Sequence, residues 1–523
     1  MDHTTGQAEM VASHQASHGL YSTTSVEVGS LVGLGGARGS FHSLAGQSGV
    51  AGSSPSGGGA AAAAVTVQDA EGWWRAAQQV LQELVRKTDE EARGTVWTPL
   101  CVSLSGQMQN VVQLGAAATG TTANWAVLYS DTALGADADS RMRQDGTAAW
   151  LGAQTGNYKG AASVAAKLRA LSGAKMTTTT TPLVFGAHSY VAYRLAGNIA
   201  SAAACDPTTA STVGLVSLTT GRWLEEHDLR NRARIGGFAF PTLLDRADAT
   251  VGHVQSGEGI PRQLWECPII HGAGDAGSTA LGAACLFPES RAHAYVGTSG
   301  WVAAIVPRGS VPPNVAFQLA HPVLKTHVLV AAPTTSAGEN VSVWSRILGL
   351  SLAHFDSAAH AAMAQRGAGP APLYIPHLRG ERFPTLIPHG RGALVDVGPE
   401  ATSGDVASAV LHGVAAQYRV MAEALGAAGA LPREEPLVVV GGGAKSRVWL
   451  QIMSNVMGRT VVRSADTAVD AAVLGAAVLG CGRGMSLRRG VDAFVPAATA
   501  RSVDQQAYDQ QWAKAVAAVH SRL

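Results

Sequence analysis

The chain has 523 residues, of which 46% are hydrophobic and 14% charged, and its net charge at pH 7 is +1. This length allows two or more domains with substantial cores, and the hydrophobic content excludes a disordered protein. The near-neutral charge argues against nucleic acid or a membrane surface as a partner, no apolar run is long enough to span a bilayer, and the five scattered cysteines indicate buried thiols rather than a disulfide framework.

The first 64 residues differ in composition from the rest. Residues 1–19 are polar and lack the apolar core of a signal peptide, and Asp2 and Glu9 argue against a transit peptide. We therefore expect a cytoplasmic protein, with organellar targeting left open. Residues 35–64 are rich in Gly, Ser and Ala and are predicted to form a flexible insert.

From Val65 onwards the chain alternates predicted helices and strands. Asp69 can cap a helix whose apolar residues repeat at helical spacing as far as Leu84. This alternation favours the α/β class. Further strands are predicted at 100–104, 125–129, 437–440 and 461–462, and further helices at 185–195, 276–286, 342–352, 403–425, 468–479 and 504–523.

Two glycine turns flank a helix of small residues. The first is Gly272-Ala273-Gly274-Asp275, which places a lone carboxylate after an apolar lead, and the second is Gly297-Thr298-Ser299-Gly300. Glycine turns let backbone N–H groups approach phosphate oxygens. A base beside such a turn is the pair that phosphoryl transfer to a hydroxyl requires. The alternative is two ordinary turns of an α/β protein.

A third glycine stretch follows a β-branched run. Leu437-Val438-Val439-Val440 leads into Gly441-Gly442-Gly443-Ala444-Lys445-Ser446, and a helix containing Trp449 and Ile452 comes next. Strand, glycine turn and helix form a nucleotide-site layout. The spacing is neither that of a Walker loop nor that of the Rossmann fingerprint.

In their order and separation, these three stretches resemble the FGGY carbohydrate kinases. The resemblance covers residues 66–485 and is strongest to xylulokinase-like members. Three more segments share it: Ser103-Leu104-Ser105-Gly106-Gln107-Met108, Asp206-Pro207-Thr208-Thr209-Ala210-Ser211, and Pro376-His377-Leu378-Arg379-Gly380-Glu381-Arg382 followed by Arg391-Gly392-Ala393.

The resemblance implies an α/β fold of two ribonuclease-H-like (actin-type ATPase) domains with a cleft between them. After the atypical segment 1–64, we expect a sugar-binding domain over 65–267 and a nucleotide-binding domain over 268–485. A tail with one helix would then occupy 486–523. The expected partners are a small-molecule sugar and ATP, with a homodimer allowed and no nucleic acid or membrane.

The implied reaction is ATP-dependent phosphorylation of a sugar hydroxyl, with Mg²⁺ bridging the phosphates. The substrate would be a ketopentose such as xylulose, or a related ketose or polyol. Asp275 matches the family's general base, against the alternative of a turn aspartate that accepts backbone N–H groups. No protein metal ligand is predicted, because the histidines lack metal-ligand spacing.

Two further sets of residues carry over from the family. Sugar contacts would come from Gln107, Met108, Gln109 and Asp131, together with Asp275. Nucleotide contacts would come from Thr23, Gly297, Thr298, Ser299, Gly441, Gly442, Gly443, Ala444, Lys445 and Asn455. A solvated lysine is an equal alternative for Lys445, and a buried structural role is an equal alternative for Asp131. Gln109-Asn110 replaces the usual His-Gly after the methionine, which suggests a different pattern of sugar hydroxyls.

One departure from the family lies at the N-terminus. Family members begin with a buried strand that runs into Asp-x-Gly-Thr-Thr-Ser-x-Lys, but alignment on Thr23-Thr24-Ser25 puts Leu20 at the Asp, Ser22 at the Gly and Glu27 at the Lys. We therefore expect the first strand and one catalytic acid to be missing, with a sheet edge left open or covered by a loop. Either the N-terminus is wrongly specified, or the chain is an impaired relative that binds sugar or nucleotide. An actin-fold ATPase acting on protein is a weaker alternative, because the sugar-side motifs argue against it.

Overall fold

The computed structural model describes residues 65–114, 125–172, 181–217, 220–312, 316–365, 372–385, 387, 390–466, 470–481, 491–496 and 510–517, and the backbone of 8–16 and 21–26. The chain divides into two compact units, Met1–Ser278 with Ala476–Gly484 and Thr279–Gly475 with Met485–Leu523. Two of the three crossings between the units fall inside helices, α8 (Asp275–Leu286) and α13 (Ala471–Cys481), and the third, between Gly484 and Met485, lies outside the described residues. The domain boundaries expected from the sequence stay predictions.

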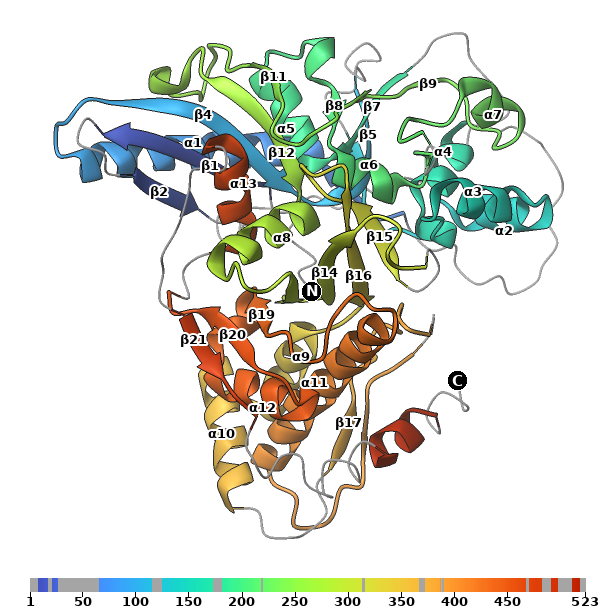
Figure 1. The fold of residues 1–523 in the computed structure, drawn as a ribbon, viewed down its shortest axis with the longest axis vertical. Coiled ribbons are helices and arrows are strands. Elements are labelled where there is room, and N and C mark those ends of the chain that lie inside the picture. Colours follow the sequence, from blue (N-terminus) through green and yellow to red (C-terminus); the bar gives the residue numbers. More distant parts are fainter. Residues whose placement is uncertain are drawn as a thin grey trace, which may run out of the picture. The chain divides into compact units, whose positions relative to one another are not determined.

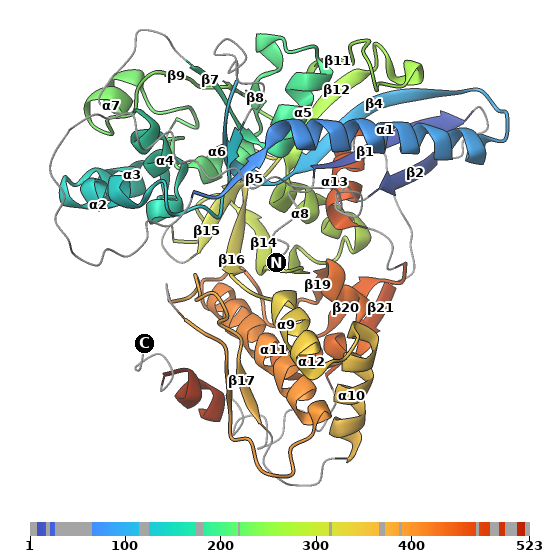
Figure 2. The same ribbon diagram turned by 180° about the vertical axis from the view of Figure 1, so that it is seen from behind.

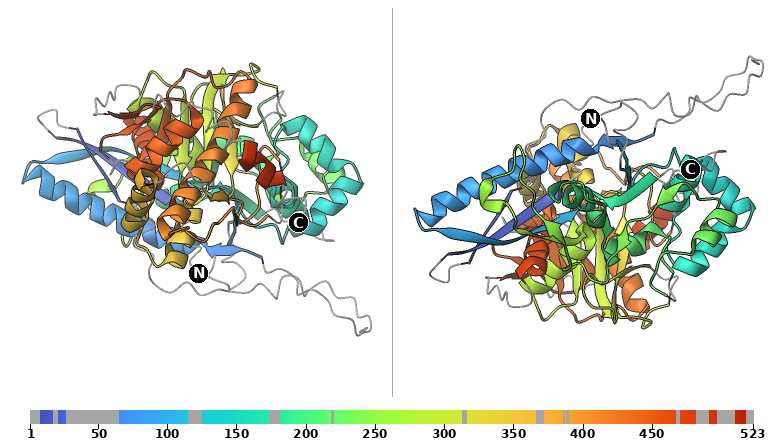
Figure 3. Two further views of the ribbon diagram at one scale, coloured as in Figure 1. Left: turned by 90° about the horizontal axis from the view of Figure 1, so that it is seen from below. Right: turned by 90° about the horizontal axis from the view of Figure 1, so that it is seen from above.

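The first unit contains a five-stranded sheet in the order β11-β12-β4-β1-β2. Its strands are β1 (Ala8–Ala16), β2 (Tyr21–Val26), β4 (Trp97–Gly106), β11 (Thr250–His253) and β12 (Pro268–Gly274). The strands β12 and β4 are parallel, and the other neighbours are antiparallel. Helix α1 (Ala70–Ala92) lies on one face of this sheet (Figures 1 and 2) and runs alongside β4 (Figure 3). Asp69 caps α1 as predicted, accepting a hydrogen bond from the Glu71 N–H.

The expectation of a missing first strand is wrong. Strand β1 pairs with β4 on one side and with β2 on the other, so the expected gap at the edge of β4 is filled. A polar segment can form a strand when its neighbours supply the backbone hydrogen bonds, since strand preference depends strongly on context. Thr23 lies in β2 opposite Ser13 of β1. Leu20, Glu27 and the insert 35–64 lie outside the described residues.

A second sheet of the first unit has the order β3-β6-β5-β7-β9, and its core includes Val111, Leu151, Leu168 and Phe185. Its strands are β3 (Val67–Asp69), β5 (Met108–Gln113), β6 (Trp125–Val127), β7 (Thr181–Gly186) and β9 (Phe238–Ala239). The remaining elements of the unit are α2 (Ala136–Gln144), α3 (Thr147–Thr155), α4 (Val164–Ser172), α5 (Ala187–Leu195), β8 (Ala204–Cys205), α6 (Pro207–Val213), α7 (Glu226–Asn231) and β10 (Thr242–Leu243).

The second unit is built on a seven-stranded sheet in the order β15-β16-β14-β13-β19-β20-β21. The strands are β13 (Ala292–Val296), β14 (Gly300–Pro307), β15 (Phe317–Ala320), β16 (His327–Thr334), β19 (Leu437–Val440), β20 (Val461–Ser464) and β21 (Val491–Phe494). A separate pair is formed by β17 (Leu373–Ile375) and β18 (Ala393–Val395). The long helix α11 (Ser403–Ala427) packs beside α9 (Gly338–Leu348), α10 (Leu352–Gln365) and α12 (Arg447–Met457) (Figure 1).

Some element bounds differ from the predictions. The helix predicted at 342–352 is two helices, because Gly349 at φ +68° ends α9 before α10 begins. The first two residues of the helix predicted at 185–195 belong to β7. The helix predicted at 504–523 lies mostly outside the described residues, which are helical at 510–517. No described helix is long and apolar enough to cross a membrane. All five cysteines are free, and three of them are buried, as the sequence indicated.

Candidate active site

The ends of two parallel strands bring the sugar-side residues together in the first unit. Gly106 at the end of β4 pairs with Gly274 at the end of β12, so Met108 and Asp275 follow at the same sheet edge. A Cβ atom on Gly274 would lie only 2.1 Å from Met108 Cγ. The methionine side chain therefore packs against the backbone immediately before Asp275, where only glycine fits.

Asp275 is a half-buried carboxylate at the first position of α8. Burial raises its pKa to about 6, and this outweighs the hydrogen bond that its Oδ1 accepts from the Ala276 N–H at 2.9 Å. A helix N-terminus alone would favour the ionised form, so desolvation is the stronger effect here. A carboxylate that titrates closer to neutral pH is a more effective proton acceptor than an ordinary aspartate.

The structure gives weaker support for the other predicted sugar contacts, Gln107, Gln109 and Asp131. Gln107 is mostly buried, and its amide donates a hydrogen bond to Gln68 Oε1 at 3.2 Å. Gln109 is half-buried and has a left-handed backbone at φ +65°. Asp131 is buried, and its two oxygens accept hydrogen bonds from the backbone N–H groups of Thr66 (2.6 Å) and Leu134 (3.0 Å). These are the contacts of a structural carboxylate, and a sugar contact of Asp131 stays a prediction.

In the second unit, two glycine turns meet at one edge of the seven-stranded sheet. Strands β13 and β19 are parallel neighbours, with Tyr295 opposite Val440. A Cβ on Gly441 would lie 2.9 Å from the Val296 carbonyl oxygen, and one on Gly443 would lie 2.3 Å from Val296 Cγ1. The two turns therefore contact each other through Val296, although 144 positions separate Gly297 from Gly441.

The turn after β13 is held by the start of α9. The carbonyl oxygens of Gly297 and Thr298 accept hydrogen bonds from the N–H groups of Gly338 and Ala337, both at 2.8 Å. Thr298 itself is exposed, and Ser299 is half-buried. The turn is thus fixed through its carbonyls while the Thr298 side chain remains accessible.

The turn after β19 has the predicted strand, turn and helix layout. Gly441 adopts φ +89°, a conformation that favours glycine, and Ser446 caps α12 by accepting the Trp449 N–H at 3.0 Å. Lys445 is exposed, next to Ala444 in the turn. Asn455 is not brought to the turn, because it lies eight residues after Arg447, or about 12 Å along the helix. A contact of Asn455 with adenine stays a prediction.

Sequence reasoning missed Arg463, which supports this turn. Its guanidinium donates hydrogen bonds to the carbonyl oxygens of Ala444 (2.7 Å) and Lys445 (3.2 Å) and pairs with Asp492 at 2.8 Å. The available signal was a lone basic residue in an otherwise apolar or small strand, Val461-Val462-Arg463-Ser464. A buried strand tolerates such a residue only when it is paired.

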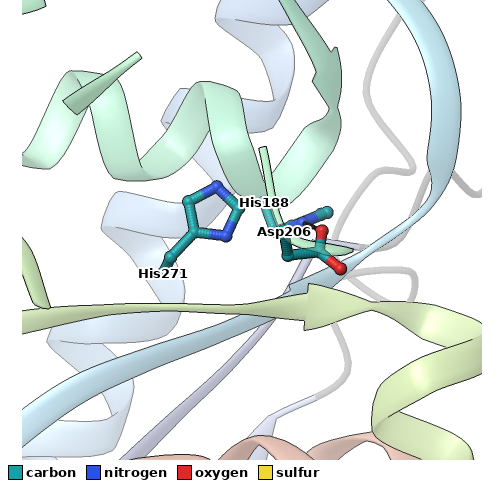
Figure 4. A group of neighbouring side chains, drawn as sticks. All are labelled: His188, Asp206 and His271. Carbon is teal, nitrogen blue, oxygen red and sulfur yellow. Dashed lines mark hydrogen bonds and ion pairs between the residues drawn. The ribbon is translucent and has the colours of Figure 1, made fainter. Parts of the chain in front are cut away.

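Sequence reasoning also missed a buried histidine–aspartate group formed by His188, Asp206 and His271 (Figure 4), all of which are fully buried. His188 Nε2 lies 3.0 Å from Asp206 Oδ2. Burial acts to raise the pKa of Asp206, but the hydrogen bond and the electrostatic interaction with His188 hold it at about 2. Burial lowers the pKa of His271 to about 4, so this ring is neutral near pH 7.

The ligand atoms of this group all lie within 4.8 Å of one another, so the group could hold a metal ion. Two of its residues are already joined by the hydrogen bond between His188 and Asp206. The nitrogen donors of the group suit transition metals better than Mg²⁺. No other group of three or more neighbouring His, Cys, Asp or Glu side chains in the described chain could hold an ion. Among the described residues, no three-residue group of this kind suits Mg²⁺, and the nucleotide phosphates would supply part of its coordination.

Comparisons with known proteins agree with the motifs. Residues 294–482 match the C-terminal domain of the FGGY family of carbohydrate kinases. A xylulose kinase of Staphylococcus epidermidis is 26% identical over 266 residues, which are 50% of this chain and 52% of that protein. A glycerol kinase of Myxococcus xanthus is 27% identical over 320 residues, 59% of this chain and 61% of that protein. The chain thus matches about half the length of the first of these relatives.

The fold extends the likeness over nearly the whole chain. A ligand-bound xylulose kinase from Lactobacillus acidophilus superposes with a TM-score of 0.71 at 20% identity, covering 90% of this chain and 93% of that one. This confirms the predicted α/β, actin-like fold class. Through residues 294–482, its ordered glycine turns and this fold, the chain is similar to the FGGY family of carbohydrate kinases.

Proposed function

We propose that the chain transfers the γ-phosphoryl group of ATP to a hydroxyl of a ketose, with a ketopentose such as xylulose as the first choice. The carrying observation is Asp275, a half-buried carboxylate whose pKa is raised to about 6, placed beside Met108 at the ends of β4 and β12. A base of this kind is what activation of a sugar hydroxyl requires.

In the proposed reaction, Asp275 accepts the proton of the sugar hydroxyl. The hydroxyl oxygen then bonds to the γ-phosphorus of ATP, the bond from that phosphorus to the β,γ-bridging oxygen breaks, and ADP leaves with the electron pair. Backbone groups of Gly297–Ser299 and Gly441–Ala444 would contact the phosphates, since small turns admit phosphate oxygens closely. The exposed Thr298 hydroxyl adds a donor.

The substrate preference rests on the residues after Met108. Asn110 is buried and accepts a hydrogen bond from the Tyr129 N–H at 3.0 Å, so it supports the fold. Gln109 is left as the polar side chain for a sugar hydroxyl, on a strained backbone that fixes its direction. A coupled ADP-release assay across ketopentoses, ketoheptoses and pentitols would identify the substrate class. If none of these compounds led to ADP release, the proposal would be contradicted.

A second candidate is an impaired relative that binds sugar or nucleotide without transferring phosphate. It is favoured by Leu20 in place of the family's N-terminal acid and by the absence, among the described residues, of a three-residue ligand group suited to Mg²⁺. Calorimetry separates the two candidates, because this one predicts binding of sugar or of ATP together with no ADP release.

Replacement of the proposed base gives the direct test. We expect Asp275→Asn to lower turnover by about 10²- to 10⁴-fold while leaving sugar and ATP affinity nearly unchanged, because only the proton acceptor is lost. Asp137→Asn, an exposed aspartate of α2, is the matched control and should keep wild-type turnover. Near-normal turnover of Asp275→Asn would sink the assignment.

A further inference from the structure

Strand β12, which ends immediately before Asp275, is held in place by buried polar contacts. On β12, His271 Nε2 lies 3.1 Å from Ser189 Oγ of α5, and Nδ1 lies 3.1 Å from the Gly272 carbonyl oxygen. The His271 ring packs edge-on against His188, with centroids 5.1 Å apart. The start of α5 and the end of β12 are therefore held together by direct side-chain contacts within the first unit.

A second path leads from the same group to the backbone next to Asp275. His188 bonds to Asp206 Oδ2, and the other oxygen of Asp206 accepts the Thr209 N–H at 3.0 Å as the cap of α6. A Cβ on Gly274 would lie 2.8 Å from Thr209 Oγ1, so this side chain lies directly against the residue before Asp275. The path is continuous: His188, Asp206, Thr209, Gly274, Asp275.

We propose that His188 and Asp206 are positioning residues for Asp275, which fix the strand end that bears the base and balance the charge around it. This rests on the proposed role of Asp275 as the base. Both side chains are completely buried, and the hydrogen bonds described for them join them to each other and to the Thr209 N–H rather than to Asp275. Their influence is exerted through the packing of Thr209 on Gly274 and through their electrostatic interactions with Asp275.

The electrostatic part has two components of opposite sign. In the described chain, the titratable side chains that act on Asp275 are His188 from α5 and Asp206 from the start of α6, beside the Ala276 N–H of its own helix. The electrostatic interaction with His188 lowers the pKa of Asp275, and the Asp206 carboxylate raises it. Since the site is desolvated, these interactions are weakly screened.

The test is the pH profile of kcat/KM for two conservative variants. His188→Gln keeps a donor for Asp206 but removes the imidazole whose electrostatic interaction lowers the pKa of Asp275, so the acid limb should move up by about 0.5 pH unit. Asp206→Asn keeps the acceptor for the Thr209 N–H but removes the negative charge, so the acid limb should move down by a similar amount. His253→Gln, at an exposed histidine of β11, is the control and should not shift the profile.

Opposite shifts distinguish positioning from a merely structural role, which would lower activity at every pH. The proposal would be overturned if the acid limb of the kcat/KM profile did not move in the two variants, or if it moved in the same direction in both. If Asp206→Asn fails to fold, His188→Gln decides alone, because it leaves the α6 cap intact.

A ¹³C NMR titration of the Asp275 carboxyl in the full chain, assigned with Asp275→Asn, gives the same comparison without turnover. A wild-type chain that releases no ADP would contradict the proposed function, while the NMR shifts would still decide this inference.

Discussion

The ionised form of Asp275, which the proposed reaction needs as its proton acceptor, lowers the stability of the folded chain. The pKa of Asp275 is raised from an ordinary value of 3.8 to about 6, chiefly by burial, so the folded chain binds this proton more tightly than the unfolded chain does. Above about pH 6, folding must therefore bury an ionised carboxylate that water solvates better in the unfolded state. A raised carboxyl pKa in a motif-bearing region is typical of functional sites.

This leads to a pH-dependent prediction for stability. Asp275→Asn removes the buried charge and keeps an oxygen for the Ala276 N–H, so it should stabilise the chain at pH 8, by at most about 3 kcal/mol. The gain should shrink as the pH falls from 8 towards 5, because the wild-type carboxyl then becomes protonated. Urea midpoints of wild type and variant at both pH values check this. A gain that stays constant with pH, or a loss at pH 8, would contradict it.

At the residue scale, the sequence predicts Asp275 but not its supports. Asp275 lies in a glycine turn that is recognisable from the neighbouring residues in the sequence. Gly297 and Gly441 lie in two other turns that are recognisable in the same way. His188, Asp206 and His271 come from three segments, and only the parallel pairing of β12 with β4 and the packing of α5 place them together. No local pattern encodes such a contact, so it could not be predicted from spacing.

At the element scale, the strand–turn–helix at 437–457 follows the prediction because each step is locally encoded. A β-branched run forms β19, glycines permit the turn, and Ser446 caps α12. The split at Gly349 was missed because apolar periodicity continues across it, whereas the left-handed backbone that ends α9 leaves no periodic signal.

Two neighbouring glycines of this turn should respond differently to the same substitution. A Cβ on Gly442 meets nothing within 4 Å, so Gly442→Val should keep the wild-type Tm while its side chain blocks the approach of ATP. A Cβ on Gly443 would lie 2.3 Å from Val296 Cγ1, so Gly443→Val should lower the Tm as well.

Calorimetry and thermal melts of the two variants make the comparison. We expect Gly442→Val to lose ATP affinity and to keep sugar affinity, because the sugar-side residues belong to the first unit. Unchanged ATP affinity in a folded Gly442→Val protein would place the nucleotide elsewhere. Loss of both ligands with an unchanged Tm would mean that the turn serves both of them.

At the scale of the whole molecule, ordered motifs predicted the two-part α/β fold, while composition alone would not have done so. The N-terminal strand was missed for a physical reason. Residues 8–16 are mostly polar or small, and the pairing of β1 between β4 and β2 depends on partners that lie up to 98 positions away. Hydrophobic patterning detects strands that bury a face, but it does not detect a segment recruited by backbone hydrogen bonds.

The last prediction concerns this N-terminal segment. We expect it to limit activity, because Leu20 and Ser22 stand where the family carries Asp and Gly, although β1 fills the edge of β4. The test is a chimera in which residues 1–64 are replaced by a family-type strand, Asp-x-Gly-Thr-Thr-Ser turn and strand. Its matched control carries Asn for the turn Asp, which preserves the strand and removes only the charge.

ADP release with sugar should be highest in the Asp chimera and low in both the Asn chimera and the native chain. Equal rates in the native chain and the Asp chimera would show that the missing acid does not limit turnover. Equal rates in the two chimeras, both above the native chain, would assign the defect to the strand rather than to the acid. Two folded but inactive chimeras would favour the sugar- or nucleotide-binding protein over the kinase.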